Sequence, residues 1–347
     1  MIQNKAQELS EKGLVPDSLI RVGIRHLLRE RLAEISADDI EHAAQAEQRF
    51  LEVMRSGSIA EMPDVANEQH YEVPAAFFDQ VLGSHRKYSS GYWPDGVNTL
   101  DDAEAAALAV TVEHAALEDG QRILELGCGW GSLTLDMASR FRRSEIVAVS
   151  NSHSQGQYIR ERAAASGLTN VSVVTADMND FQPEGRFDRI VSVEMFEHMR
   201  NWEVLLGRAA DWLDADGRMF LHVFVHRRVP YLFEDEGPGD WMSRHFFSGG
   251  MMPSADLPLR LCSPFTLERR WFWSGEHYAR TCNAWLDRMD DRKAVLRPLF
   301  EQTYGRDFAS LWWHRWRMFF MACAELFGYR NGQEWLVAHY RFIKDPA

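Results

Sequence analysis

Apolar residues recur along the chain with two different periods, and the change of period divides the sequence into regions. Residues 1–66 are rich in charge and repeat apolar residues at helical spacing. The stretch "SLIRVGIRHLLRERLAEI" predicts one amphipathic helix, and "DDIEHAAQAEQRFLEVMRSGS" predicts another, ended by Gly57 and Ser58. The pattern therefore predicts an N-terminal helical extension over residues 1–66.

After "DGQ" at residues 119–121, short apolar runs alternate with helical segments. Strands alternating with helices predict an α/β fold with a parallel, doubly wound sheet covered on both faces. The near-continuous apolar character of the strands fits that burial. The expected strands are "RILEL", "EIVAVS", "VSVVTA", "FDRIVSV" and "RMFLHVFV", and the expected helices are "SLTLDMASRF", "QGQYIRERAAAS" and residues 201–213.

Residues 226–262 break the alternation with glycine, proline and aromatic residues, including "EDEGPGDWMSRHFFSGGMMPS". Such long insertions are usually lids or binding loops, so we expect a cap over the main domain, residues 67–347. Residues 264–331 are predicted to be C-terminal helices that complete the cap, and "WLVAHYRFIK" a last strand.

Aromatic residues gather in the insertion and in the C-terminal helices. Trp241, Phe246 and Phe247 in the insertion are the better pocket candidates. The stripe in "LWWHRWRMFF" has helical spacing and favours a core face. It comprises Trp312, Trp316, Phe319 and Phe320.

Composition narrows the classes of partner. The 347 residues are 46% hydrophobic, enough for a packed core, and carry a formal net charge of -13. That charge disfavours nucleic acid and anionic membranes, and no apolar run is long enough for a membrane span. No signal peptide is seen, and the cysteines form no CxxC pair, so a reduced cytoplasmic protein is expected. The cysteines are Cys128, Cys262, Cys282 and Cys323.

The first apolar strand runs into a glycine-rich loop, "LELGCGWGS". Gly127, Gly129 and Gly131 fall between a strand and a helix, where a ligand can approach the backbone and the amides at the helix start. The spacing is GxGxG after Glu125, whereas a dinucleotide fingerprint places its third glycine one residue later. The form is more typical of methyltransferases that use S-adenosylmethionine. The alternative is a structural strand-to-helix turn.

The ends of the next two strands supply polar side chains. The second strand offers Ser150, Asn151 and Gln155 where a nicotinamide enzyme usually offers an acid, so these residues can bond a ribose diol without charge. The third strand is followed by Asp177, which can accept from an adenine amino group. A turn or helix-cap aspartate is the alternative for Asp177.

Glu194, Glu197 and His198 follow the strand "FDRIVSV" directly. One interpretation is a helix start, where acids offset the helix dipole. The other is a proton-handling site at the carboxyl edge of the sheet, where such folds bind ligands. On a helix, Glu194 and His198 would share a face, and paired carboxylates would raise each other's pKa. We therefore favour a catalytic cluster.

At this point the chain resembles the cyclopropane-fatty-acid-synthase superfamily of class I methyltransferases, and more closely its coclaurine N-methyltransferase-like branch. The wider resemblance rests on "KYSSGYW", "LELGCGWGSLTL", "SNSHSQ", "RIVSVEMFEHM" and "HYARTCNAWL". The closer one rests on "YEVPAAFF", "EMFEHMRNW", "GGMMPSADL" and "AELFGYRNGQEWLVAH".

The resemblance implies a Rossmann-like fold and roles for individual residues. Glu194, Glu197 and His198 match the catalytic cluster of the coclaurine-type enzymes, whereas the lipid enzymes usually carry glycine where Glu194 stands. The residues expected to bind S-adenosyl-L-methionine are Tyr88, Ser89, Glu125, Gly127, Gly129, Asn151, Gln155, Asp177 and Met178.

The lipid enzymes of the superfamily also bind bicarbonate, and this chain has residues that match the anion's shell. They are Cys128, Glu197, His222 and Tyr278. Either bicarbonate is still bound or the shell survives as packing, and the sequence leaves both open. His222 and His226 lie four apart on an expected strand, but with no third ligand at suitable spacing we expect no metal site.

The function predicted from the sequence is S-adenosylmethionine-dependent N-methylation of a small, alkaloid-like amine. The alternative is cyclopropane-fatty-acyl-phospholipid synthase-type C-methylation of a lipid alkene, which needs membrane docking that the acidic charge disfavours. The expected partners are a small-molecule amine, no nucleic acid and no stable membrane insertion, with a homodimer left open.

Overall fold

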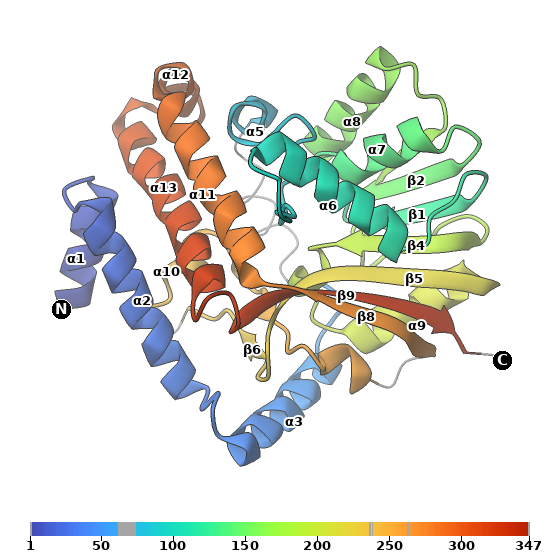
Figure 1. Cartoon of the computed structure of the whole chain (residues 1–347), viewed down its shortest axis with the longest axis horizontal. Helices are drawn as coiled ribbons and strands as arrows, with labels where there is room; N and C mark the ends of the chain where they lie inside the picture. The colour runs from blue at the N-terminus through green and yellow to red at the C-terminus, as the bar shows by residue number, and fades with distance from the viewer. Residues whose placement is uncertain (1, 62–73, 236, 238, 262–263, 346–347) are drawn as a thin grey trace.

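A seven-stranded sheet forms the centre of the computed structural model, which describes residues 2–61, 74–235, 237, 239–261 and 264–345 (Figure 1). The strand order is β3-β2-β1-β4-β5-β9-β8. The first five strands in this order pair in parallel, as the alternation of strands and helices predicted. The strands are β1 (Arg122–Leu126), β2 (Glu145–Ser150), β3 (Val171–Thr175), β4 (Phe187–Val193), β5 (Leu213–His226), β8 (Phe265–Trp273) and β9 (Trp335–Lys344).

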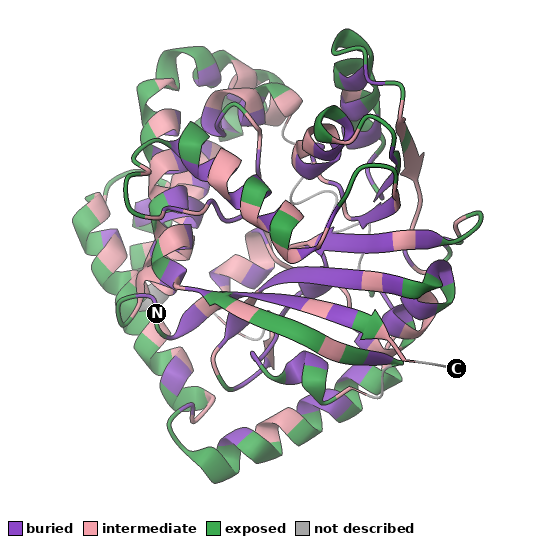
Figure 2. Cartoon of the chain, turned by 45° about the vertical axis from the view of Figure 1, so that its right-hand side comes forward, coloured by how far each residue is buried: buried purple, intermediate pink, exposed green. Residues whose placement is uncertain are grey.

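Helices cover both faces of the sheet, which confirms the doubly wound arrangement. Successive residues of a strand point to opposite faces of the sheet. Val191 and Phe220 pack with α6, α7 and α8 on one face, while Ile190 and Met219 pack with α9 on the other. Figure 1 shows α6, α7 and α8 on one side of the strands and α9 on the other, and Figure 2 shows the central strands largely buried. The helices are α6 (Leu100–His114), α7 (Ser132–Arg140), α8 (His153–Ala165) and α9 (Trp202–Trp212).

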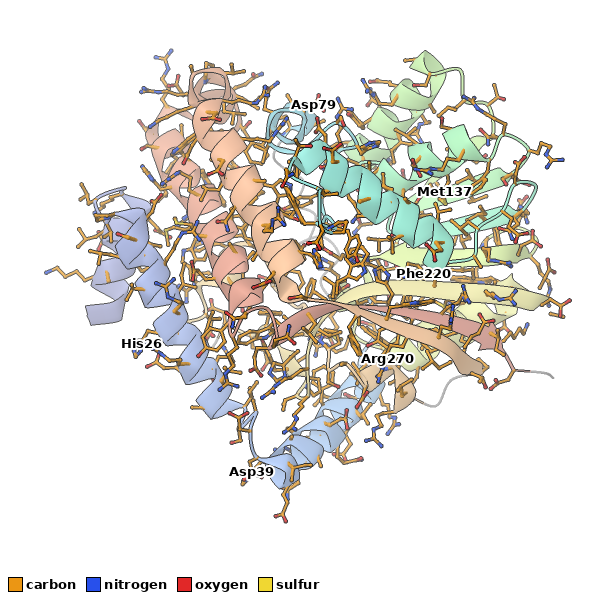
Figure 3. All side chains as sticks on the ribbon, viewed as in Figure 1. His26, Asp39, Asp79, Met137, Phe220 and Arg270 are labelled. Carbon is orange, nitrogen blue, oxygen red and sulfur yellow. The ribbon has the colours of Figure 1, made fainter. Side chains whose placement is uncertain are left out.

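β9 and β8, at one edge of the sheet, pair in antiparallel orientation, and the presence of β8 differs from the prediction for residues 264–331. Residues 264–331 do not form helices throughout, because β8 takes up Phe265–Trp273 and pairs with β9. Glu268, Arg269 and Arg270 interrupt the apolar pattern in the middle of this strand. Charges of this kind are typical of an edge strand, whose outer side faces water. Figure 3 labels Arg270 on this edge.

Helices from the two ends of the chain pack together beside the sheet. Arg317 of α13 bonds both Asp17 of α2 and Asp290 of α11, and Arg315 of α13 bonds Glu11 of α1. The predicted N-terminal extension is therefore joined to the C-terminal helices, but its boundary at residues 66 and 67 lies outside the described residues. The helices are α1 (Ile2–Glu11), α2 (Asp17–Glu34), α3 (Ile40–Ser56), α5 (Ala75–Val81), α11 (Gly275–Asp291), α12 (Lys293–Tyr304) and α13 (Arg306–Gly328).

The insertion is ordered where it is described, and it packs on the C-terminal helices. Phe246 is fully buried and stacks on Phe319 of α13 at 4.5 Å between ring centroids, with Trp241 beside it. Trp241 and Phe246 are thus core residues and not the pocket residues expected, whereas the α13 stripe is core as predicted. The insertion contains β6 (Tyr231–Leu232), α10 (Trp241–His245), β7 (Met251–Met252) and η2 (Leu257–Leu259).

Candidate functional site

The glycine-rich loop between β1 and α7 borders a cavity at the carboxyl ends of the parallel strands. Gly127 has a φ of +77°, and a Cβ there would lie 2.5 Å from the Met195 side chain, so this position requires glycine. Gly129 has a φ of +51°, and a Cβ there would meet no described protein atom within 4 Å. A side chain at Gly129 would instead take up space that a ligand could use.

The cavity wall carries buried polar atoms that suit a polar ligand. Gln155 Nε2, Ser132 Oγ and Trp130 Nε1 are buried and have no hydrogen-bond partner among the described residues. Buried polar groups are normally bonded, so atoms of this kind mark a place where a bound molecule supplies the missing partner. Together with the open side of Gly129, they fit a nucleoside-containing cofactor.

All nine residues expected to bind the cofactor line this one cavity. Asp177 also accepts the N–H of Asn179 at 2.8 Å, so it shapes a turn as well. At the end of β1, Glu125 is buried and accepts Thr134 Oγ1–H at 2.5 Å, and burial raises the pKa of Glu125 to about 8. The structure brings these residues together, and their individual roles stay predictions.

Lys87 is a buried residue that the sequence patterns did not single out. Its Nζ donates to Ser89 Oγ at 2.6 Å and to the carbonyl oxygen of Ser90 at 2.8 Å. Burial lowers the pKa of Lys87 to about 8, and the nearby Glu194 opposes that shift. The available signal was its position directly before Tyr88 in the "KYSSGYW" motif.

Glu194 directly follows β4, with its carboxyl group in the cavity wall. Oε1 accepts the Ser90 N–H at 3.0 Å and lies 3.1 Å from His222 Nε2, while Oε2 accepts Tyr278 O–H at 2.5 Å. Burial raises the pKa of Glu194, although Lys87 and these donors oppose the shift. Glu194 is thus an oriented carboxyl group whose charge responds to its surroundings.

The backbone at Glu194 corrects the expected helix geometry. Its φ is +48°, in the left-handed region, and only Phe196–His198 form a helical turn, η1. Glu194 and His198 therefore do not share a helix face. A left-handed conformation costs a non-glycine residue roughly 1–2 kcal/mol. Strain of this kind gathers at functional sites, where it directs a side chain.

The helix-start interpretation of this acidic cluster finds little support in the geometry. The next helix, α9, begins at Trp202, and its N-terminus is capped by Asn201, which accepts the Val204 N–H at 3.1 Å. Glu203 is the acid in its first turn. Glu194 lies well before that helix and faces the cavity.

Glu197 and His198 occupy different surroundings. His198 lines the cavity and packs against Phe247, with 4.5 Å between ring centroids. Burial lowers the pKa of His198 to about 4, and Glu194 opposes the shift, so the ring is neutral near neutral pH. Glu197 is fully buried behind the wall: Oε1 accepts the Phe224 N–H at 2.7 Å, and burial raises its pKa well above the usual value.

Of the residues matched to a bicarbonate shell, Cys128 lines the cavity, but His222 and Tyr278 both bond Glu194. The Glu194 carboxyl group thus stands between these two side chains. His226 is buried and lies 3.1 Å from Glu334. In the part of the chain that the structure describes, no group of three or more His, Cys, Asp or Glu residues is arranged to hold a metal ion.

The helices give a separate observation about membranes. No helix in the described part of the chain is long and apolar enough to pass through a bilayer.

Comparison with known proteins gives consistent matches over most of the chain. The sequence profile of the mycolic acid cyclopropane synthetase family matches residues 60–335. An (S)-coclaurine N-methyltransferase from Thalictrum flavum subsp. glaucum is 36% identical over 338 residues, covering 96% of this chain and 94% of the relative. The cyclopropane-fatty-acyl-phospholipid synthase of Escherichia coli (strain K12) is 29% identical over 283 residues, covering 81% of this chain and 69% of the relative.

Solved structures show the same relationship. The crystal structure of a coclaurine N-methyltransferase bound to N-methylheliamine and SAH superposes with a TM-score of 0.94 at 35% identity, covering 98% of this chain and 99% of the other. The fold is that of class I S-adenosylmethionine-dependent methyltransferases, as the sequence predicted.

Proposed function

The chain belongs to the mycolic acid cyclopropane synthetase family, and from that premise we propose that it N-methylates a small, alkaloid-like amine held by Glu194. It is an S-adenosylmethionine-dependent methyltransferase, as its relatives are. Relatives in this family include both N-methyltransferases and a lipid cyclopropanating enzyme, so the acceptor must be argued from the site.

The observation that carries the proposal is a carboxyl group placed beside the glycine loop on a strained backbone. Glu194 lines the same cavity as Gly127 and Gly129 and has only 8% of its side chain exposed. A carboxylate in such a site attracts a cation, and most alkaloid-type amines are protonated near neutral pH. A neutral alkene carries no positive charge for this carboxylate to bind.

Each residue of the cluster has a distinct part in the proposal. The Glu194 carboxylate binds the substrate ammonium, while Ser90 N–H and Tyr278 O–H hold the carboxylate in place. His198, neutral and in the cavity wall, accepts the ammonium proton so that the nitrogen can attack. Bound S-adenosylmethionine supplies the methyl group from its sulfonium. Glu197 is buried behind the wall and positions the backbone of Phe224.

A product screen tests the acceptor class. Purified protein is incubated with methyl-labelled S-adenosylmethionine and separate panels of amines, phenols and phospholipid vesicles. We expect label in the amine panel, on nitrogen, because in these acceptors the reacting atom itself carries the charge that Glu194 binds. Label confined to phospholipid would contradict the proposal and favour cyclopropanation, and label confined to phenols would favour O-methylation.

Bicarbonate is expected to be dispensable for amine methylation. The side chains of His222 and Tyr278, which match an anion shell, already bond the Glu194 carboxyl group. Turnover in carbonate-free buffer should therefore equal turnover after bicarbonate is added back. A large gain on adding bicarbonate would show that the site uses the anion.

The variant Glu194→Gly sharpens this test. Glycine accepts the left-handed backbone without strain and leaves His222 and Tyr278 available to a small anion. If bicarbonate stimulates this variant but not the parent, the Glu194 carboxylate takes the place of the anion. If bicarbonate stimulates the variant and the parent equally, the Glu194 carboxylate does not take the place of the anion.

A further inference from the structure

Three histidines from three elements form a continuous hydrogen-bonded row that ends on Glu194. His222 Nε2 lies 3.1 Å from Glu194 Oε1, and His222 Nδ1 lies 2.8 Å from His339 Nε2. His339 Nδ1 in turn lies 2.8 Å from His114 Nδ1. β5 carries His222, β9 carries His339, and His114 is the last residue of α6. Both buried rings therefore use both of their nitrogens.

The row connects the cavity with a different part of the molecular surface. His222 and His339 are fully buried, whereas His114 is only half-buried. Among the described residues that line the cavity, none of these three histidines is included. Glu194 thus reaches two environments, the cavity at its own side chain and the solvent near His114.

Aromatic side chains enclose the row along its length. Trp271 of β8 stacks on His114 with 3.9 Å between ring centroids, and Trp273 of the same strand lies 4.4 Å from His339. Phe220, labelled in Figure 3, packs on His339 from the opposite side at 5.1 Å. These aromatic rings help to bury His222 and His339, whose ring nitrogens bond their neighbours in the row, while His114 stays half-buried.

We propose that His222, His339 and His114 form a histidine relay through which Glu194 loses a proton when a substrate ammonium enters and regains one when the product leaves. The relay rests on the proposed function, because it requires a cationic amine beside Glu194. With substrate in the cavity, the open side of the Glu194 side chain, which is only 8% exposed, is covered, and the row of histidines remains as a hydrogen-bonded path to His114.

The proton balance of one outward passage is as follows. The Glu194 Oε1–H bond breaks and His222 Nε2–H forms; His222 Nδ1–H breaks and His339 Nε2–H forms. His339 Nδ1–H then breaks and His114 Nδ1–H forms, and the proton on His114 Nε2 passes to water. His222 Nε2–H now donates to the Glu194 carboxylate. The return passage reverses every step, so no buried ring has to rotate between turnovers.

The surroundings keep the three rings neutral, as a relay requires, since a neutral imidazole has one donor and one acceptor nitrogen. Burial lowers the pKa of His222 and of His339 well below the usual value and that of His114 to about 4. The other titratable or charged groups near the two ends are Lys87, His198, Tyr278, Glu113, Arg269 and Arg341.

Proton release on amine binding tests the relay without methyl transfer. Protein loaded with S-adenosylhomocysteine is mixed with N-methylheliamine in weak buffer, and a pH-indicator dye follows the protons. We expect the parent to release protons as fast as the amine binds, and Glu194→Gln to release none. In His114→Ala, proton release should slow by about tenfold or more while the amine still binds, and added imidazole should restore the rate.

A second variant separates relay from packing. His114→Gln keeps a polar group beside His339 but offers no imidazole, so a relay predicts release as slow as in His114→Ala. A packing role predicts that glutamine restores the parent rate. The matched control is His26→Ala, on the exposed surface of α2, which Figure 3 places away from the sheet; it should behave as the parent.

Proton release at the parent rate in both His114 variants, or no proton release in the parent on binding, would overturn the relay. An outcome in which the parent neither binds nor methylates any amine would overturn the proposed function instead, and the relay with it. If the parent methylates amines and the His114 variants release protons at the parent rate, the relay alone is overturned and the proposed function stands.

Discussion

Protein carrying Glu194→Gln is expected to bind the cofactor normally and to methylate amines about 10²–10⁴ times more slowly than the parent. Glutamine keeps the shape of the side chain and an acceptor for the Ser90 N–H, but it removes the charge that holds the ammonium. His198→Ala should lower turnover by a similar factor, because it removes the proton acceptor. Steady-state rates and calorimetric cofactor binding measure both effects.

Two further measurements examine whether the pair acts on one proton. The losses in the double variant should be less than multiplicative if Glu194 and His198 handle the same ammonium. Raising the pH should partly rescue His198→Ala, because more of the amine is then neutral without help from the protein. An unchanged pH profile in His198→Ala would argue against His198 as the acceptor.

Glu203→Gln is the matched control for Glu194→Gln. Glu203 is an acid in the first turn of α9 and bonds Arg55, so its loss should change the melting temperature slightly, by the equivalent of about 0.3–1 kcal/mol, and leave turnover alone. If Glu194→Gln and His198→Ala behave in the same way as this control, the cluster is structural and the catalytic assignment is wrong.

Replacing Gly129 by valine is expected to abolish measurable binding of S-adenosylmethionine and of S-adenosylhomocysteine. Apart from its chain neighbours, a Cβ at Gly129 would have no described protein atom within 4 Å, so valine would project into open space beside the cavity wall that includes Gln155 and Asp177. A cofactor filling that space would then clash with the side chain. Calorimetry on the folded variant is the measurement.

Valine also strains the left-handed backbone at Gly129, and a control must separate that strain from the clash. Gly167 has a φ of +63°, likewise has no described atom within 4 Å of an added Cβ, and does not line the cavity. Gly167→Val should lose stability comparably but keep cofactor affinity. Parent-like affinity in a folded Gly129→Val protein would overturn the placement of the cofactor beside the loop.

The parallel part of the fold was predictable because each of its elements has a pattern that can be detected locally. β1, β2 and β4 are largely buried and apolar residues predominate in them, and glycines mark the turn that follows β1. β8 was missed because its charged middle faces water at a sheet edge, where the apolar pattern weakens.

The residues of the candidate site could also be predicted in part from the sequence, whereas their geometry could not. Motifs close in sequence identified Gly129 and Glu194, and the structure brings them to one cavity. The left-handed turn at Glu194 could not be derived, because the local spacing was equally compatible with a helix. The backbone there is fixed by the hydrogen bond from the Glu194 N–H to the carbonyl oxygen of His222 on the neighbouring strand.

The sequence by itself therefore determined the parallel sheet, the glycine-rich loop and the acidic cluster, since each is encoded by neighbouring residues. Only the tertiary structure decided what surrounds the cluster. His339 bonds His222 across 117 residues of sequence and His114 across 225, and no local pattern distinguishes His339 and His114 from ordinary core or surface histidines. Their contact exists because β9 inserts antiparallel beside β5 and the end of α6 packs over it, an arrangement set by the burial of whole elements.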